Sequence, residues 1–381
     1  MICQLKIAIS FSAFILPPLM FWLLIDYSVI IGYNKDYRNK FMLSRLERYK
    51  LYEPDFDKKL KLLGEQSRRV TKTEGVGEKM QDIKEYDTFS NIEHIRKGMS
   101  DDKKYRIETA NERRLLLRVA DISEYERKKN EFVLMKKAFA LDVPMSHPID
   151  FGKCDNGKSV YTLMTWIDGK EVEAVLPALA ESEQYILGIN SGKILRKIHT
   201  IPAPPNADDW AARYFTVIDE RLDAFRREGV SFNGDATILA FLENNRNLLR
   251  KRPQYRHHGD YHEGNMILTE GGEISVIDWH TVDFDNFGDP WYEFNRIGTS
   301  FPAFASGQID GYFNGEPPIE FWTLLAYYLS ASAITSIVWA KYFAPERLDA
   351  ILQLNSNVLS WFDNMQNPVP TWYLNKTNIE K

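Results

Sequence analysis

Hydrophobic and polar positions alternate with a period of two from residue 89 onward, which is the pattern of half-buried β-strands. A charged segment at 122–140 then changes to helical periodicity, with its apolar residues on one side. Two more alternating segments follow before residue 165. These patterns predict a small antiparallel sheet accompanied by one helix. The strands are expected at 92–95, 105–108, 114–119, 149–151 and 159–164.

From residue 181 onward the apolar positions recur every three or four residues, which predicts a mainly helical second part of the chain. Residues 321–340 carry no charge and are long enough to cross a membrane. Five Ser or Thr residues in that stretch favour a buried helix instead. The other amphipathic helices are expected at 181–199, 208–227 and 236–251.

A β-hairpin is predicted between two apolar runs, 266–268 and 274–277, because Glu-Gly-Gly-Glu separates them. Asn265 precedes the first run and Asp278 follows the second, so the hairpin should bring them together. Carboxylate and carboxamide oxygens are ligands that Mg²⁺ prefers. Asp260, five residues before Asn265, is the candidate catalytic base, which completes the set that phosphoryl transfer requires. The alternative is that these residues only form turns.

The stretch 258–265, HGDYHEGN, followed by VIDW at 276–279, resembles the aminoglycoside phosphotransferase family. These are small-molecule kinases related in fold to choline kinases and protein kinases. The resemblance covers residues 80–343 and implies an α+β, two-lobed protein-kinase-like fold, with an N-terminal antiparallel sheet plus helix and a mainly helical C-terminal lobe. The implied domains are an N-terminal extension at 1–79, a nucleotide-binding N-lobe at 80–166 and a catalytic and substrate-binding C-lobe at 167–381.

The resemblance implies ATP and Mg²⁺ as cofactors. Gly98 and Ser100 would lie in the loop that covers the nucleotide phosphates. Arg118 stands on the third strand, where the family carries a lysine for the phosphates. Arginine keeps the charge and offers a planar fork of donors. The departure from lysine nevertheless leaves a non-catalytic nucleotide-binding module open as an alternative.

The remaining nucleotide contacts are also expectations from the resemblance. Glu131 is the carboxylate expected to hold the strand cation, with Glu126 as the alternative. Met164 and Trp166 belong to the expected hinge, whose backbone would meet the adenine. A protein kinase is a weaker interpretation, because the sequence shows no recognisable activation segment that ends in an APE-like motif.

Composition limits the partners. A formal charge of −5 and a pI near 5.9 give no reason to expect nucleic acid. Two cysteines do not make a disulfide framework, and this usage fits a reducing cytoplasm. Residues 281–325 hold seven acids, one base and many aromatic residues, which suits a cationic acceptor unless this is only an acidic solvent face. The predicted activity is ATP-dependent phosphorylation of a hydroxyl on a small, cationic molecule, such as an aminoglycoside-like antibiotic or an amino-alcohol metabolite.

The N-terminal extension leaves two interpretations open. Residues 7–32 include a run of uncharged residues, 7–25, that is long enough for a membrane anchor, and basic residues follow it. Gly77-Glu78-Lys79, just before Met80, could instead reflect a ribosome-binding sequence, with translation starting at Met80. Either interpretation leaves the catalytic domain in the cytoplasm. The oligomeric state does not follow from the sequence.

Overall fold

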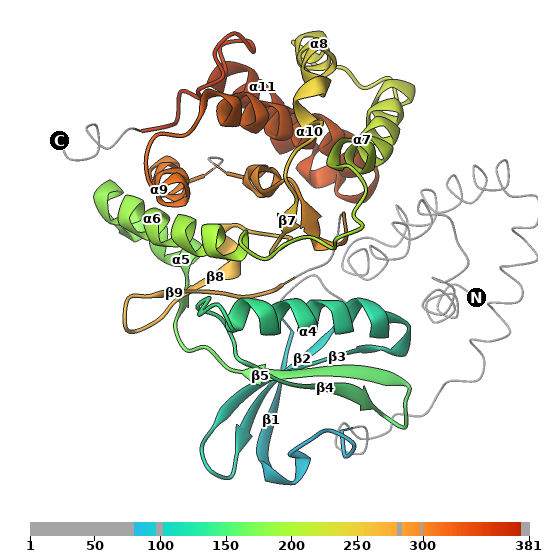
Figure 1. The fold of residues 1–381 in the computed structure, drawn as a ribbon, viewed down its shortest axis with the longest axis vertical. Helices are drawn as coiled ribbons and strands as arrows, with labels where there is room; N and C mark the ends of the chain where they lie inside the picture. Colours follow the sequence, from blue (N-terminus) through green and yellow to red (C-terminus); the bar gives the residue numbers. More distant parts are fainter. Residues whose placement is uncertain (1–79, 97–101, 280–283, 298–299, 375–381) are drawn as a thin grey trace, which may run out of the picture. The chain divides into compact units, whose positions relative to one another are not determined.

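The computed structural model describes residues 80–96, 102–279, 284–297 and 300–374 (Figure 1). The chain divides into two compact units, 1–129 with 149–165 and 130–148 with 166–381. The limits of the extension and of the two lobes therefore stay predictions. The expected anchor at 7–32 and the loop residues Gly98 and Ser100 lie outside the described residues.

The first unit contains a five-stranded sheet in the order β1-β2-β3-β5-β4. The pairs β1–β2, β2–β3 and β3–β5 run antiparallel. Every strand lies where the alternating pattern predicted one. The elements are η4 (Tyr86–Thr88), β1 (Phe89–Ile95), β2 (Lys103–Thr109), β3 (Arg114–Asp121), η5 (Ile122–Glu124), α4 (Tyr125–Phe139, which continues into the second unit), β4 (Pro148–Cys154) and β5 (Ser159–Thr165).

Alternation along β2 and β3 builds the core of this unit. Tyr105 pairs with Leu117 across the strands, and Ile107 pairs with Leu115. All four side chains are at most 5% exposed and belong to one apolar cluster. Because neighbouring residues of a strand face opposite sides of the sheet, Arg118 lies on the face opposite to this cluster.

The second unit is mainly helical, with short strands between the helices. The α-helices are α5 (Val172–Val175), α6 (Glu181–Ile198), α7 (Trp210–Arg227), α8 (Asp235–Asn245), α9 (Pro302–Phe313), α10 (Ile319–Phe343) and α11 (Leu348–Trp361). The 3-10 turns are η6 (Leu176–Ala178), η7 (Arg246–Leu249), η8 (Glu263–Asn265), η9 (Phe284–Asn286), η10 (Pro290–Phe294) and η11 (Pro345–Arg347). The strands are β6 (Lys170–Glu171), β7 (Tyr255–Arg256), β8 (Met266–Leu268), β9 (Ile274–Val276) and β10 (Phe287–Gly288).

Two predicted helix limits differ from the structure. The helix expected from residue 208 begins at Trp210, because the side chain of Asp209 accepts a hydrogen bond from the Ala211 N–H (3.0 Å) and so caps it. The helix expected over 236–251 is α-helical only to Asn245, and a 3-10 turn continues it.

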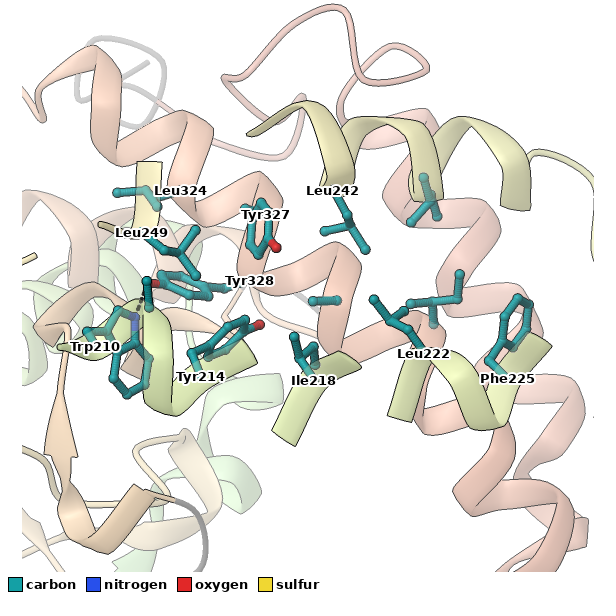
Figure 2. Packing of buried hydrophobic residues seen from close by; sticks show 14 of the residues in the cluster. Trp210, Tyr214, Ile218, Leu222, Phe225, Leu242, Leu249, Leu324, Tyr327 and Tyr328 are labelled. Carbon is teal, nitrogen blue, oxygen red and sulfur yellow. Dashed lines mark hydrogen bonds between the residues drawn. The ribbon is translucent and has the colours of Figure 1, made fainter. Parts of the chain in front are cut away.

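The main core of the second unit lies between α7, α8 and α10 (Figure 2). Trp210, Tyr214, Ile218 and Leu222 recur every four residues and form the buried stripe of α7. The indole Nε1 of Trp210 donates a hydrogen bond of 2.9 Å to the hydroxyl of Tyr328, as the dashed line in Figure 2 marks. The indole N–H is therefore buried with a hydrogen-bond partner, so its burial carries no penalty for an unsatisfied donor.

Helix α10 is the one helix of the described residues that is long and apolar enough to cross a membrane. Its most apolar window is 72% buried inside the protein. The preference for a buried helix over a membrane span at 321–340 is therefore confirmed.

Helices α6 and α9 pack backbone against backbone. Gly188 and Gly192 of α6 lie against the backbone of α9, and Gly307 and Gly311 of α9 lie against the backbone of α6. Each pair is spaced by four residues and therefore lies on one side of its helix. A Cβ atom added to Gly192 would lie 2.0 Å from the carbonyl oxygen of Gln308. Only glycine fits at this distance, so these residues determine how closely the two helices approach.

Candidate active site

The hairpin of β8 and β9 brings the two predicted metal ligands to the same end. Met266 pairs with Val276, and the N–H of Ile277 donates to the carbonyl of Asn265 (3.0 Å). The ladder thus extends to Asn265, and Asp278 is the next residue on the partner strand. Asp278 has a φ of 59°, a left-handed conformation that a short aspartate side chain tolerates. Such conformations are frequent at functional sites.

The side chain of Asn265 is oriented by Asp260. Its Nδ2 donates to the carbonyl oxygen of Asp260 (2.9 Å) and to Oδ2 of the same residue (3.0 Å). Within the described part of the chain, Oδ1 of Asn265 accepts no hydrogen bond, so it is the atom that can bind a cation. The described residues include no group of three or more His, Cys, Asp or Glu that could hold a metal. One carboxylate and one carboxamide fit Mg²⁺, which takes its other ligands from phosphates and water.

The carboxylate of Asp260 lies between the side chains of Arg296 and His262. Arg296 donates from Nη1 to Oδ1 (2.6 Å), and Nε2 of His262 lies 3.4 Å from Oδ2. Burial disfavours the charged carboxylate, but the hydrogen bond from His262 and the charge of Arg296 outweigh it and hold the pKa of Asp260 well below its usual range. At neutral pH this group is therefore an ionised acceptor that can orient a hydroxyl.

His262 receives the N–H of Gly264 on Nδ1 (3.1 Å), so Nε2 carries the hydrogen that faces Asp260. Burial lowers the pKa of His262, whereas the hydrogen bond to Asp260 and the charge of that carboxylate raise it, and the net direction is upward. The two side chains thus stabilise each other's charged form. His262 was assigned no role from the sequence.

Glu293 holds the backbone of the loop that carries Asp260. Its Oε1 accepts the N–H of Gly259 (2.7 Å), and its Oε2 accepts the N–H of His258 (2.8 Å). His199 also contacts Oε2 through Nε2 (2.9 Å). Burial disfavours the charge of Glu293, but the hydrogen bond from His199 and the neighbouring histidines outweigh it, and the pKa is lowered to about 2. His199 is a hydrogen-bonded core histidine.

His258 connects the loop with the second hairpin strand. Its Nε2 lies 3.0 Å from the carbonyl oxygen of Ile277, and the N–H of Asp260 lies 3.4 Å from its Nδ1. The side chain is fully buried, and burial lowers its pKa. The ring also packs 4.8 Å from the ring of Trp279, which follows Asp278. The neutral imidazole therefore fixes the distance between the candidate base and the candidate metal ligand.

Further anchors come from Tyr261 and Asp289. The hydroxyl of Tyr261 donates to the carbonyl of Ser191 on α6 (2.7 Å). Asp289 is fully buried and accepts from Nε of Arg252 (2.7 Å) and from the hydroxyl of Tyr328 (2.8 Å). Asp289 therefore fixes the loop after the hairpin.

The acid-rich segment 281–325 divides between internal and exposed roles. Asp289 and Glu293 are the buried anchors described above. Asp310 accepts from the hydroxyls of Tyr185 and Tyr373, at 2.6 Å each. The one basic residue of the segment, Arg296, donates a hydrogen bond to the carboxylate of Asp260. The local excess of negative charge toward an acceptor is consequently smaller than the sequence count indicates.

The first unit places Arg118 in an ion cluster. Its Nε donates to Oδ2 of Asp102 (3.0 Å), and Nζ of Lys128 lies 2.5 Å from the same oxygen. Glu131, in the second unit, is 6% exposed. Met164, on β5, is buried and pairs with Leu116, and Trp166 is half-buried in the second unit. The described residues therefore show a pairing of Arg118 that sequence reasoning did not anticipate.

The sequence contains features that could have identified several of these site residues. Lys128 occurs at helical spacing with the buried Glu131, Met135 and Ala138, which places it on the buried face of α4. Glu293 lies in η10, which begins directly after Gly288-Asp289 with Pro290. No local sequence pattern predicts the ion pairs of Asp102 or of Arg296, because each pair joins residues that are distant in the chain.

The chain thus combines an antiparallel sheet and one helix with a mainly helical unit that carries Asp260, Asn265 and Asp278 around one hairpin. The sequence model of the phosphotransferase enzyme family matches residues 91–322. The chain belongs to this family, and the predicted kinase-like fold is confirmed.

Solved structures are similar in fold at low sequence identity. A choline/ethanolamine kinase family protein from Mesorhizobium loti is 16% identical, with a TM-score of 0.52, over 75% of this chain and 94% of that one. The gentamicin complex of APH(2")-IIa is 17% identical, with a TM-score of 0.51, over 70% and 91%. ADP-bound APH(2'')-Ib is 15% identical, with a TM-score of 0.51, over 73% and 96%. No curated protein gave a significant match.

Proposed function

We propose that this phosphotransferase transfers the γ-phosphoryl group of ATP to a hydroxyl of a small, cationic molecule, with Mg²⁺ as cofactor. The observation that carries the proposal is the double hydrogen bond from Asn265 Nδ2 to Asp260, on a hairpin end shared with Asp278. This arrangement supports a site in which an ionised acceptor and two hard oxygen ligands lie close together. Phosphoryl transfer needs mainly positioning and charge neutralisation, which such a set supplies.

Within this proposal Asp260 orients the acceptor hydroxyl and receives its proton. The lowered pKa of Asp260 supports orientation as its main contribution, because a strongly acidic carboxyl is a weak base. Asn265 and Asp278 would hold the magnesium, which supplies charge neutralisation on the phosphates when bound. Glu293 and His258 position these groups without touching the substrate.

The nucleotide contacts are proposed as the resemblance implies them. Arg118 binds the α- and β-phosphates, and Glu131 supports that cation. Gly98 and Ser100 belong to the loop over the phosphates. The backbone between Met164 and Trp166 meets the adenine. The buried position of Met164 and the ion cluster of Arg118 are compatible with these assignments.

A cationic acceptor is supported by the carboxylate of Asp260, whose present cationic partner is the exposed side chain of Arg296 (61%). An amine close to the reacting hydroxyl can take the place of this guanidinium, because exposed ion pairs contribute little free energy. Two of the structures of similar fold are complexes of APH(2")-IIa, one with gentamicin and one with streptomycin and ATP. Aminoglycoside-like antibiotics and amino-alcohol metabolites are the acceptor classes to test first.

The second candidate is a non-catalytic nucleotide-binding module, which the replacement of the usual lysine by Arg118 favours. A protein kinase ranks lower, since the sequence shows no recognisable activation segment ending in an APE-like motif; the Ala-Pro-Glu at 344–346 follows the long helix α10. ADP production in a coupled assay over antibiotics and amino alcohols separates these functions. Nucleotide binding without turnover on any acceptor would favour the module.

The catalytic part is proposed to work in the cytoplasm, where ATP is available. Residues 7–32 then either anchor it to the membrane or are not translated. N-terminal sequencing of the expressed protein distinguishes these cases, because a start at Met80 excludes the anchor.

The decisive variant is Asp278→Asn, with Glu273→Gln as the matched control in the exposed turn of the same hairpin. We expect Asp278→Asn to abolish transfer and Glu273→Gln to retain it, because Asp278 would contribute a charged metal ligand and Glu273 would not. Chelation with EDTA should also abolish transfer, and added Mg²⁺ should restore it. Unchanged phosphorylation by Asp278→Asn would exclude the metal assignment.

A further inference from the structure

Arg296 is the single basic residue in the acid-rich segment 281–325, and its guanidinium contacts the candidate catalytic carboxylate. Its Nη1 donates to Oδ1 of Asp260 at 2.6 Å. Among the described residues this is the one hydrogen bond of the Arg296 side chain, whereas a guanidinium has five N–H donors. The side chain is also 61% exposed, so further donors are available to a ligand.

The two carboxylate oxygens of Asp260 have different surroundings. Oδ2 accepts from Nδ2 of Asn265 at 3.0 Å and lies 3.4 Å from Nε2 of His262. Within the described part of the chain, Oδ1 accepts from Arg296 alone. Each oxygen of a carboxylate offers about two lone-pair sites. Oδ1 is therefore the atom that can still accept the hydroxyl of the acceptor, directly beside the guanidinium.

Stability alone does not account for this ion pair. A pair with a cation as exposed as Arg296 contributes little to folding. The pair also opposes the proposed base, because an adjacent cation favours the charged form of a carboxylate over the protonated form. A guanidinium that stayed on Asp260 throughout the reaction would hinder proton transfer to it. The position of Arg296 therefore suits a cation that leaves Asp260 when the proton arrives.

The proposed reaction brings a second anion to the same place. The acceptor hydroxyl oxygen forms a bond to the γ-phosphorus of ATP, and the bond from that phosphorus to the β–γ bridging oxygen breaks. The hydroxyl proton passes to Asp260, which becomes neutral, and ADP leaves. A hydroxyl that donates to Oδ1 lies about 2.7 Å from it, and Nη1 of Arg296 lies 2.6 Å from the same atom. A phosphoryl group bonded to that hydroxyl oxygen is thus within reach of the guanidinium.

We propose that Arg296 is a catalytic residue, which pairs with Asp260 before the reaction and donates to the transferred phosphoryl group during it. The inference rests on the proposed phosphotransferase function, because it assigns a further residue to the same site. An arginine suits this role, since it stays charged and presents a planar fork of donors to phosphate oxygens. Such a donor stabilises the charge of the phosphoryl group in the transition state.

The test compares Arg296→Met with Arg226→Met in the full-length protein. Arg226 is a matched control, because its Nη1 lies 2.7 Å from Oδ1 of Asp223 and its side chain is 54% exposed. Calorimetry measures the binding of two probes. ADP with Mg²⁺ and aluminium fluoride imitates the phosphoryl group during transfer, and AMP-PNP with Mg²⁺ imitates ATP before it. Loss of one charge-assisted hydrogen bond should weaken binding of the aluminium fluoride complex at least about tenfold in Arg296→Met.

AMP-PNP should bind Arg296→Met as it binds the wild type, and Arg226→Met should bind both probes unchanged. Arg296→Lys keeps the charge and should recover part of the affinity for the aluminium fluoride complex. In turnover with the acceptor that the coupled assay identifies, Arg296→Met should lower kcat about 100-fold and leave KM for ATP unchanged. In an Asp260→Asn background, Arg296→Met should still weaken the aluminium fluoride complex, which separates a direct contact from an effect through Asp260.

Equal affinity of Arg296→Met and the wild type for the aluminium fluoride complex would overturn the inference while leaving the proposed function intact. Equal losses for both probes would also overturn it, since they indicate a structural role. A lower KM for the acceptor at unchanged kcat would overturn it as well, because Arg296 would then only occupy the place of an acceptor cation. If the wild type binds neither probe, the proposed function itself fails. Should Arg296→Met not fold, Arg296→Gln keeps a polar end, and the same comparison applies.

Discussion

Replacing Glu293 with glutamine would remove a buried charge beneath the loop that carries Asp260. The carboxylate accepts two backbone N–H groups, of His258 and Gly259, at 2.8 and 2.7 Å, and contacts His199 at 2.9 Å. A glutamine side chain of the same shape has only one oxygen. Its NH₂ group would face one of these donors, so at least one hydrogen bond is replaced by a repulsive contact.

The magnitude follows from the lowered pKa of Glu293. The side chain is 3% exposed, and its pKa is about 2 instead of 4.5. That difference corresponds to about 3 kcal/mol of folding free energy, present above pH 4.5 and lost as the pH falls through the folded-state pKa. Glutamine, which has no charge at any pH, should therefore lower the free energy of unfolding at pH 7 by about 3 kcal/mol.

The effect on activity should be separate from substrate binding. If the loop shifts by about 1 Å, kcat should fall about 100-fold, because Asp260 loses its alignment with the acceptor hydroxyl. KM for ATP should change little, since Glu293 contacts only the loop and His199. Urea denaturation gives the stability change, and a coupled assay of ADP release gives the kinetic parameters.

Glu320→Gln is the matched control. Its carboxylate is 50% exposed and pairs with Arg252 at 3.2 Å. An exposed pair of this kind contributes at most about 1 kcal/mol. A folded Glu293→Gln protein with kcat within threefold of the wild type would refute the positioning role of Glu293.

Two further predictions follow from the second unit. Gly192→Ala should lower the free energy of unfolding by about 3 kcal/mol, because the new Cβ overlaps the carbonyl of Gln308. The control Gly271→Ala should be neutral, because the nearest atom to its new Cβ lies at 3.8 Å. Urea titrations measure both variants, and a Gly192→Ala protein as stable as the wild type would contradict the packing argument. His262→Ala should raise the pKa of Asp260 toward its ordinary value and so move the acid limb of the pH profile of kcat/KM to higher pH. An acid limb at the same pH as in the wild type would show that His262 does not lower the pKa of Asp260.

Much of the fold was predictable from the sequence because burial follows local periodicity. The alternation in β2 and β3 and the four-residue stripe of α7 each decide which side of an element faces the core. Turn chemistry similarly predicted the hairpin of β8 and β9, and with it the proximity of Asn265 and Asp278. Local capping, as by Asp209, was the detail that shifted a predicted helix end.

The candidate site was predictable where its residues are close in sequence. Asp260 and Asn265 are five residues apart, and their hydrogen bonds lie within one loop. Arg296 lies thirty-six residues from Asp260, and the pairing of Asp102 with Lys128 spans twenty-six. Such pairs form only when tertiary packing brings opposite charges together, and the local periodicity of the sequence does not predict that packing.

The backbone contact between α6 and α9 also limits how this protein can change. Helix α6 carries Ser191, which holds Tyr261 of the catalytic loop, between the two glycines that meet α9. One added methyl group on that side would displace the helix and the loop with it. Laboratory evolution toward a new acceptor should therefore find its tolerated substitutions among exposed residues near Asp260 and very few on the inner side of this helix pair.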